Sequence, residues 1–327
     1  MDVSRTQAEA TRLLPLAERV LTRYPFDLRE VNHLASHSNV QFRVVTESGE
    51  LFVLRVGTPH ANSRTNIDVE VAWLDALRQE TDLEVVKPIR STDGSLVIDE
   101  YDDGLAKERA CVLFSWVPGQ PMAEGSGPFA YRLLGQMSAS LQDHGQQWSP
   151  PRGARMRVWD EVFYYREDDP VILHTPKFSH LFDMARLRTI EKAIRLSQDV
   201  IVESYASGLP QVVHGDLHEW NVHLAGSRFY AFDFEDVMIA LPAQDAAISL
   251  YSSRTSEIKD DVREAFRKGF ESIAAWPIAD ERQLDGFHAA RQVMLMNYAA
   301  RTLPVDESTD YLDRVTPWLD RYVKRYA

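Results

Sequence analysis

The 327-residue sequence contains one cysteine, Cys111, so it lacks both an internal disulfide framework and a cysteine-rich zinc site. No apolar run approaches the roughly 18 residues that a membrane-spanning helix needs. The first residues, MDVSRTQAEATRLL, contain no apolar signal core. There is no basic tail or stripe, and the formal net charge is −13, which argues against binding to nucleic-acid phosphates. We therefore expect a cytoplasmic protein with no membrane or nucleic-acid partner.

Several enzyme signatures are also missing. The sequence has no Gly-Lys-Ser/Thr of a P-loop, no GxGxxG fingerprint and no Gly-x-Ser-x-Gly elbow. P-loop NTPases, Rossmann dehydrogenases and α/β-hydrolases therefore lose their main support. His214, His218 and His223 lie in a strand-and-turn pattern without HExxH, which does not favour a zinc hydrolase.

The first 117 residues have the pattern of a small antiparallel sheet with one inserted helix. An amphipathic helix is predicted at 5–23, a hairpin at 40–56 around a Ser48-Gly49 turn, and a second helix at about 65–80. Further strand-like segments are predicted at 83–90, 95–101 and 109–117.

The turn cluster VPGQP at 117–121 marks the boundary between two predicted domains, 1–117 and 118–327. The second domain is mainly helical, with short β-like pieces between Gln211 and Asp233. Its predicted helices cover 127–143, 184–206, 242–253, 256–274, 280–302 and 309–325. The predicted fold class is therefore α+β, with a small β-lobe followed by a larger helical lobe.

The densest chemical segment is VVHGDLHEWNVHLAGSRFYAFDFED, residues 212–236. Asp216 and Asn221 lie five residues apart across a polar turn, and Asp233 follows twelve residues later at the end of a hairpin pattern. Phosphoryl transfer needs one carboxylate for the attacking hydroxyl, and an amide oxygen with a second carboxylate to hold Mg²⁺. This order matches a kinase catalytic loop followed by a metal loop. Taken singly, each residue could also cap a polar turn.

Two of these motifs carry a family resemblance. HGDLHEWN resembles the HGDxxxxN catalytic loop of the aminoglycoside phosphotransferase and choline kinase family, which has a protein-kinase-like fold, and AFDFED resembles its second metal motif. The whole-chain pattern is similar to the branch that holds stress-response kinase and homoserine-kinase-like proteins. Four weaker segments follow the family order within about residues 30–250: FVLRV (52–56), DVEVAWLDAL (68–77), FSWVPG (114–119) and LPAQDAA (241–247).

The resemblance implies a role for each matching residue. Asp216 corresponds to the catalytic base, and Asn221 and Asp233 correspond to the magnesium ligands. Arg55 stands where the family has a phosphate-contacting lysine, and Glu70 stands where it has the ion-pair partner of that lysine. The resemblance also implies nucleotide contacts by Ser38 and Asn39 and by the backbone of Ser115, Trp116 and Val117, and structural support by His214 and Asp245.

The sequence departs from the family pattern at several positions. Arginine at 55 can hold a phosphate but is not equivalent to lysine, and the loop around Ser38 has no glycine-rich stretch. The metal motif reads DFE, so Glu235 is either a further metal contact or a surface acid. Asp160 and Asp236 are candidate contacts for an amine-bearing substrate, with a solvated face as the alternative for such acids.

The implied function is Mg²⁺-dependent transfer of the ATP γ-phosphate to a hydroxyl of a small amine-bearing molecule, such as an aminoglycoside, choline, ethanolamine or homoserine. Two alternatives stay open: a serine/threonine protein kinase of the stress-response type, and a nucleotide-binding pseudokinase or sensor. Only a short segment separates Asp233 from the helix near Leu241, which argues against a eukaryotic activation loop. The oligomeric state is left open.

Overall fold

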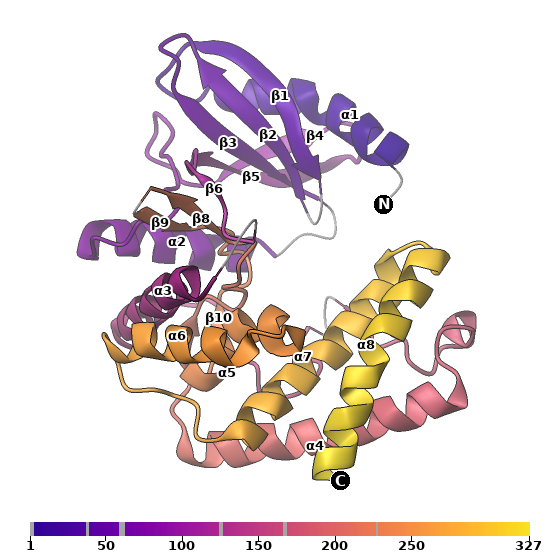
Figure 1. Cartoon of the computed structure of the whole chain (residues 1–327). Helices are drawn as coiled ribbons and strands as arrows, with labels where there is room; N and C mark the ends of the chain where they lie inside the picture. The colour runs from indigo at the N-terminus through magenta and orange to yellow at the C-terminus, as the bar shows by residue number, and fades with distance from the viewer. Residues whose placement is uncertain (1–2, 37–38, 59–62, 124–126, 166–168, 227) are drawn as a thin grey trace. The chain divides into compact units, whose positions relative to one another are not determined.

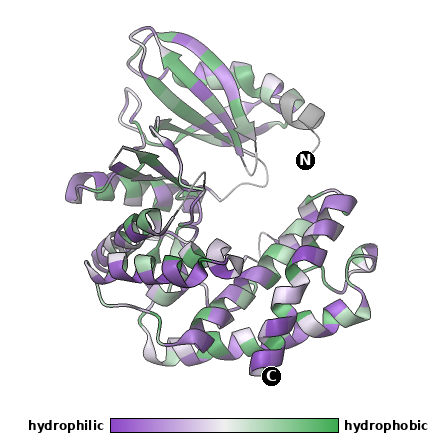
Figure 2. Ribbon diagram, in the orientation of Figure 1, coloured by the Kyte–Doolittle hydropathy of each residue, from purple (hydrophilic) through white to green (hydrophobic). Residues whose placement is uncertain are grey.

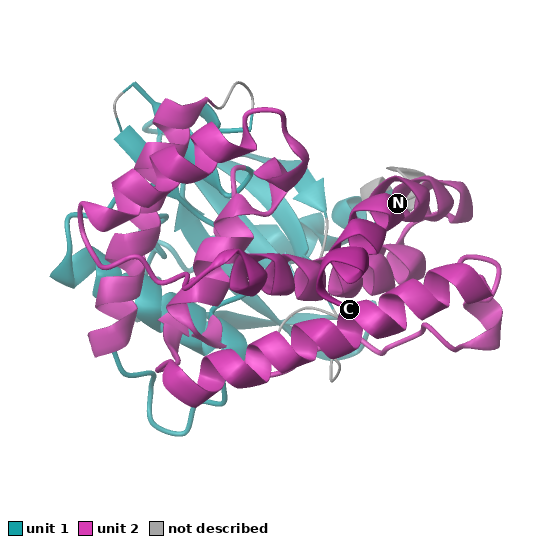
Figure 3. Cartoon of the chain, turned by 60° about the horizontal axis from the view of Figure 1, so that its bottom comes forward, with its two compact units in different colours: residues 1–124, 148–156, 220–237 teal, residues 125–147, 157–219, 238–327 magenta. Residues whose placement is uncertain are grey.

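The computed structural model describes residues 3–36, 39–58, 63–123, 127–165, 169–226 and 228–327. The chain divides into two compact units, coloured separately in Figure 3. Unit 1 comprises residues 1–124, 148–156 and 220–237, and unit 2 comprises residues 125–147, 157–219 and 238–327. A single break at residue 117 therefore does not describe the division, because two later segments pack with the N-terminal residues. Asn221 and Asp233 belong to unit 1, whereas Asp216 belongs to unit 2.

Unit 1 is built on an antiparallel five-stranded sheet with the strand order β1-β2-β3-β5-β4 (Figure 1). Its elements are α1 (Val3–Leu21), β1 (Leu28–Ser36), β2 (Asn39–Thr46), β3 (Leu51–Gly57), α2 (Arg64–Glu80), β4 (Ile98–Asp102), β5 (Lys107–Ser115), β6 (Gln120–Pro121), β8 (Val222–Ala225) and β9 (Arg228–Ala231). The predicted hairpin forms as β2 and β3, and its turn uses Gly49 at φ +85°, a conformation that glycine adopts without a steric penalty. These strands confirm the β-rich first part of the predicted fold.

The hydrophobic core of unit 1 lies between α1 and one face of this sheet. Hydrophobic residues recur along its strands (Figure 2). Leu54 and Val56 of β3 are buried in the cluster that also contains Leu13 and Ala17 of α1. Because successive strand side chains point to opposite faces, Arg55 lies on the other face of β3. Arg55, the one charged residue of β3, therefore lies on the face away from the core that contains α1.

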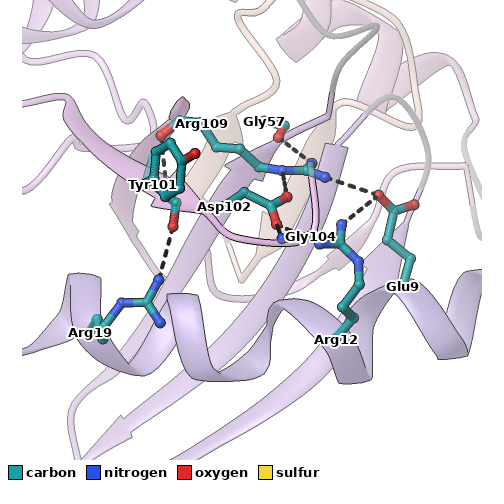
Figure 4. Close-up of polar contacts among 9 residues, drawn as sticks. Glu9, Arg12, Arg19, Gly57, Tyr101, Asp102, Gly104 and Arg109 are labelled. Carbon is teal, nitrogen blue, oxygen red and sulfur yellow. Dashed lines mark hydrogen bonds and ion pairs between the residues drawn. The ribbon is translucent and has the colours of Figure 1, made fainter. Parts of the chain in front are cut away.

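A partly buried ionic network attaches α1 to the edge of the sheet (Figure 4). Asp102 accepts hydrogen bonds from Arg12 Nη1 at 2.5 Å, from Arg109 Nε at 2.5 Å and from the backbone N–H of Gly104 at 2.9 Å. Arg109 Nη1 also donates to the carbonyl oxygen of Gly57, the last residue of β3, at 2.7 Å. The network therefore joins α1, the β4–β5 turn and the end of the strand that carries Arg55.

Replacing Asp102 by asparagine should strongly destabilise unit 1. The side chains of Asp102 and Arg109 are 3% and 1% exposed, and removing one partner of a buried pair typically costs about 3 kcal/mol or more. Burial opposes ionisation of Asp102, but Arg12 and Arg109 outweigh it and lower its pKa to about 2. This contribution is therefore present above about pH 4 and is lost as the pH falls toward 2. Thermal unfolding of Asp102→Asn tests this, with exposed Asp103→Asn as the matched control; equal midpoints would contradict it.

A second, three-stranded sheet of unit 1 has the order β6-β8-β9. It is connected to the chain after α2 by a bridge between Val85 and Ala231, where Val86 N–H donates to the Ala231 carbonyl oxygen at 2.9 Å. The predicted strand at 83–90 was wrong, since this segment makes only isolated bridges at Val85 and Pro88. Each bridge involves a different partner strand, so no continuous ladder forms.

Unit 2 is mainly helical, as predicted. Its elements are α3 (Pro128–Gln147), the 3₁₀ helix η1 (Pro176–Phe178), α4 (Met184–Ser207), β7 (Gln211–Val213), β10 (Met238–Ala240), α5 (Pro242–Leu250), the 3₁₀ helix η2 (Ser252–Thr255), α6 (Lys259–Glu271), α7 (Glu281–Thr302) and α8 (Val305–Tyr326). The backbones of α3 and α6 lie in close contact at two glycines. A Cβ on Gly135 would lie 2.0 Å from the Phe266 carbonyl oxygen, and a Cβ on Gly269 would lie 1.9 Å from the Arg132 carbonyl oxygen. No helix among the described residues combines the length and apolar character that a membrane crossing requires.

Candidate functional site

The first part of the candidate site is a buried ion pair in unit 1. Arg55 Nη1 donates to Glu70 Oε1 at 2.8 Å, and Arg55 Nη2 donates to Glu70 Oε2. Arg55 and Glu70 are 6% and 2% exposed. Burial raises the pKa of Glu70, and the neighbouring Arg55 acts in the opposite direction. The two-pronged contact holds the guanidinium in one orientation, with its central carbon 5.0 Å from the centroid of the Phe114 ring.

Helix α2 positions two parts of the site from one face. Glu70 and Trp73 are three residues apart, so they are neighbours on the helix surface. Trp73 contacts the ring of Phe234 edge-to-face at 5.5 Å between centroids, and Phe234 is fully buried. The helix therefore fixes both Arg55, through Glu70, and the middle residue of the DFE motif.

The hairpin β8–β9 brings Asn221 close to the DFE motif. Val222 pairs with Ala231, so Asn221 lies opposite Phe232, whose N–H donates to the Asn221 carbonyl oxygen at 3.0 Å. Asp233 follows with φ +63°, in the left-handed region that aspartate and asparagine enter more readily than most residues. Although Asn221 and Asp233 are twelve residues apart in the sequence, strand pairing places them near each other in the hairpin.

Glu235 contacts two other predicted residues of unit 1. Its Oε2 accepts a hydrogen bond from Asn39 Nδ2 at 2.5 Å and lies 3.9 Å from Arg55 Nη1. The carboxylate therefore joins the first residue of β2 to the ion pair on β3. Ser38 lies outside the described residues.

A pocket of about 190 Å³ opens beside these groups within unit 1. Ser115 N–H donates to the Lys87 carbonyl oxygen at 2.8 Å and Trp116 N–H donates to that of Leu51 at 3.3 Å. Within the described chain the N–H of Val117 has no backbone partner. The pocket is lined by Leu34, Gln41, Val53, Arg55, Glu70, Val86, Phe114, Ser115, Trp116, Val117, His223, Phe232 and Asp233.

Some pocket residues were not singled out as nucleotide contacts from the sequence. Val86 and His223 lie outside the motifs, and Phe232 lies within AFDFED next to Asp233. His223 and Phe232 are neighbours in the pocket. Their rings contact edge-to-face at 4.8 Å between centroids. The pocket therefore combines apolar and aromatic walls with the Arg55, Glu70 and Asp233 charges.

The second part of the candidate site lies in unit 2, around the loop after β7. His214 is fully buried, and its Nδ1 accepts a hydrogen bond from the N–H of Asp216 at 3.2 Å. Asp245 Oδ1 accepts from the N–H of Gly215 at 2.9 Å, and its Oδ2 accepts from Gln142 Nε2 at 3.2 Å. These contacts restrain the loop at Gly215 and Asp216.

The carboxylate of Asp216 is flanked by two basic side chains. Arg291 Nη2 donates to its Oδ1, and His218 Nε2 lies 3.2 Å from its Oδ2. Burial opposes ionisation, but the interactions with His218 and Arg291 prevail and hold the pKa of Asp216 below its usual value. Asp216 is therefore a carboxylate at neutral pH. Arg291 was missed from the sequence because it is one of three arginines in α7, 75 residues away from Asp216, with no motif around it.

Asp245 should make unit 2 less stable as the pH rises, the opposite of the effect of the ion-paired carboxylate Asp102 on unit 1. Burial raises its pKa to about 6, against the hydrogen bonds from Gly215 and Gln142. The folded protein therefore keeps a proton that the unfolded chain loses near pH 4, and stability falls by about 3 kcal/mol as the pH rises from 4 to 6. Asp245→Asn should flatten that part of the curve. Unfolding midpoints of both proteins between pH 4 and pH 7 test this, and parallel curves would contradict it.

The two candidate substrate contacts lie in different units. Asp160 is an exposed residue of unit 2 whose backbone carbonyl oxygen accepts a hydrogen bond from Gln198 Nε2 at 3.0 Å. Asp236 is a partly buried residue of unit 1, three positions after Asp233. Their assignment as substrate contacts stays a prediction.

Residues 29–287 match the model of the phosphotransferase enzyme family. An uncharacterised protein of Synechocystis sp. is 28% identical over 240 residues, covering 71% of this chain and 63% of that protein. Amicoumacin kinase of Bacillus subtilis is 24% identical over 237 residues, covering 70% of this chain and 65% of that protein. The matched region thus spans slightly less than two thirds of each curated relative.

Two solved structures have the same fold. The microcompartment-associated aminopropanol kinase has a TM-score of 0.79 at 22% identity, with 96% of this chain and 97% of that chain covered. The amicoumacin kinase hAmiN, in complex with AMP-PNP, Ca²⁺ and Ami, has a TM-score of 0.75 at 19% identity, with 96% of each chain covered. The predicted kinase-like α+β fold is therefore confirmed.

Proposed function

Because this chain belongs to the phosphotransferase enzyme family, we propose that it transfers the γ-phosphate of ATP to a hydroxyl group of a small amine-bearing molecule. Unit 1 holds the nucleotide in this proposal, and Asp216 of unit 2 acts on the acceptor hydroxyl. The observation that carries the proposal is the buried Arg55–Glu70 pair, which lines the same pocket as Asp233. A rigidly held guanidinium beside a carboxylate suits the phosphate end of a nucleotide.

The remainder of the unit 1 pocket suits a purine base and ribose. Val53, Val86 and Phe114 offer apolar surface, and Val117 N–H is the proposed backbone donor to the base. Pockets for small ligands commonly combine such apolar walls with a few polar groups that fix the orientation. Asn39, joined to Glu235, is proposed to stand beside the phosphates.

The donor set of unit 1 also fits Mg²⁺. Asn221 and Asp233 supply hard oxygen donors, which Mg²⁺ prefers, and Mg²⁺ usually takes only one or two carboxylates together with substrate phosphates and water. The described residues contain no group of three or more His, Cys, Asp or Glu side chains that could hold a metal ion by themselves. When bound, Mg²⁺ would neutralise charge on the phosphates. Asn221 and Asp233 would hold it, and Arg55 would orient the same phosphates.

Asp216 is proposed to position and deprotonate the acceptor hydroxyl. It is ionised because His218 and Arg291 stabilise its charge, and the His214 and Asp245 hydrogen bonds fix the backbone that presents it. A group held in this way contributes mainly by orientation and by accepting a proton in the transition state. The sensor alternative has less support, because every residue that the chemistry needs is present.

The chemical class of the acceptor is proposed on two grounds, which are the sequence resemblance and the names of the similar proteins. The names of the similar proteins include an aminopropanol kinase and an amicoumacin kinase. A protein acceptor is the alternative that the experiment separates from a small molecule.

The test uses γ-labelled ATP and Mg²⁺ with separate pools of amino alcohols, aminoglycosides, amino acids with a hydroxyl group, and a generic protein substrate. Label in a small-molecule fraction that depends on Asp216 supports the proposal. Label confined to protein transfers the assignment to a protein kinase. Binding of AMP-PNP without label transfer to any pool would favour a nucleotide sensor.

A further inference from the structure

A second pocket, of about 280 Å³, lies in unit 2 among α6, α7, α8 and the η2 turn. Leu284, His288 and Tyr322 form buried parts of its wall. Asp216 and Arg291 do not line it, and the proposed phosphoryl transfer does not require it. Its volume admits a small molecule. Its charged lining consists of Arg254, Lys259, Arg263, Arg321 and Arg325 together with Asp260, Glu281 and Asp285.

The acidic side chains of this pocket are paired with only two of its five basic ones. Arg263 Nη1 contacts Glu281, and Arg263 Nη2 lies 4.0 Å from Asp260. Arg325 lies 3.3 Å from Asp285. The other three, Arg254, Lys259 and Arg321, form no ion pair with any residue that the structure describes. The pocket thus has an unbalanced positive charge in a chain whose net charge is −13.

Arg254 is held in a fixed orientation at this pocket. Its Nη1 donates to the Tyr251 carbonyl oxygen at 2.6 Å, and its Nη2 donates to Gln292. The guanidinium carbon lies 3.6 Å from the Tyr251 ring centroid and 5.1 Å from that of Trp318. Its Nε is buried and has no hydrogen-bond partner among the described residues. Such a pre-oriented guanidinium loses little conformational freedom when it meets an anion.

Three arginines, Arg254, Arg291 and Arg263, act electrostatically on His288 in the wall of the pocket. This side chain is 4% exposed, and its Nε2 contacts the Ala247 carbonyl oxygen at 2.9 Å. Burial, followed by the positive charges of Arg254, Arg291 and Arg263, lowers the pKa of His288 to about 3. His288 is therefore neutral at physiological pH, and the surrounding arginines provide the local field.

We propose that this pocket binds a small anion that carries a phosphate or carboxylate group. Arg254, Lys259 and Arg321 supply the positive charges, and Trp318 supplies an aromatic wall for the remainder of the ligand. Phosphate and carboxylate oxygens match the donor geometry of arginine. The site is separate from the nucleotide pocket, which lies wholly in unit 1.

Isothermal titration calorimetry of the full chain with inorganic phosphate at low ionic strength tests the proposal. Wild type should show saturable binding to one site. Lys259→Gln combined with Arg321→Gln should weaken that binding at least tenfold. The control combines Lys268→Gln and Lys324→Gln, two exposed lysines on the same helices α6 and α8 that do not line the pocket. It makes the same change in net charge and should alter binding less than twofold.

Two results would overturn the proposal. One is the absence of saturable binding of both phosphate and succinate to wild type, and the other is unchanged binding in the Lys259/Arg321 double variant. Tighter binding of phosphate than succinate assigns a phosphoryl ligand, and the reverse assigns a carboxylate ligand. If the double variant does not fold, the exposed Arg321→Gln change alone should still weaken binding about threefold, and unchanged binding would again overturn the proposal.

Discussion

Asp216→Asn is expected to reduce label transfer by about 10³-fold, the scale of a lost general base. The substitution keeps the shape of the side chain but removes the negative charge that now meets Arg291 and His218. An amide cannot accept the proton of an acceptor hydroxyl in the same way. AMP-PNP affinity should stay within a factor of about two in this variant, because the proposed nucleotide pocket lies in unit 1.

This prediction needs a control for folding, since Arg291 is buried and loses its partner. Asp199→Asn makes the same charge change at an exposed position of α4 in unit 2 and should leave turnover unchanged. Circular dichroism and AMP-PNP titration of both variants establish whether each protein is folded. Full turnover in a folded Asp216→Asn protein would remove Asp216 from the role of base.

The local parts of the candidate site could be predicted because short-range geometry determines them. Strand alternation is enough to place Arg55 on the face away from Leu54 and Val56. Hairpin pairing similarly brings Asn221 to the DFE motif across the intervening residues. These arrangements need only the period of a strand and the position of a turn, and both are visible in the residue pattern.

The parts that escaped prediction depend on long-range packing. Arg291 meets Asp216 only because α7 packs near the loop after β7, and a single arginine in a helix gives no indication of this. The strand β1 was also missed, since many of its residues are exposed at the edge of the sheet and supply little hydrophobic signal. Conversely, residues 83–90 have the composition of a strand, but Val85 and Pro88 form bridges to two different strands, so the segment makes no continuous strand. The helix predicted at 242–253 is also shorter than expected, because α5 ends at Leu250 and the 3₁₀ turn Ser252–Thr255 follows it.

Replacing Asp233 should reduce Mg²⁺-dependent ATP binding more than replacing any other residue of unit 1. Asp233→Asn is the informative change, because asparagine tolerates the left-handed φ of +63° about as well as aspartate. The variant therefore removes the charge without disturbing the backbone. We expect turnover to fall by about 10²–10³-fold, together with a loss of the difference between ATP affinities measured with Mg²⁺ and with a chelator.

Asp233→Ala separates the backbone contribution from that of the carboxylate. Alanine pays a steric penalty of about 1 kcal/mol in the left-handed region, so this variant should unfold at a lower temperature than Asp233→Asn. Both variants should nevertheless lose Mg²⁺-dependent ATP binding equally, because both lack the carboxylate. Asp82→Asn, an exposed change in unit 1, should behave as wild type in both assays. If Asp233→Asn kept the Mg²⁺ dependence while Asp233→Ala lost it, the residue would act through its backbone conformation, and another oxygen donor would have to hold the metal.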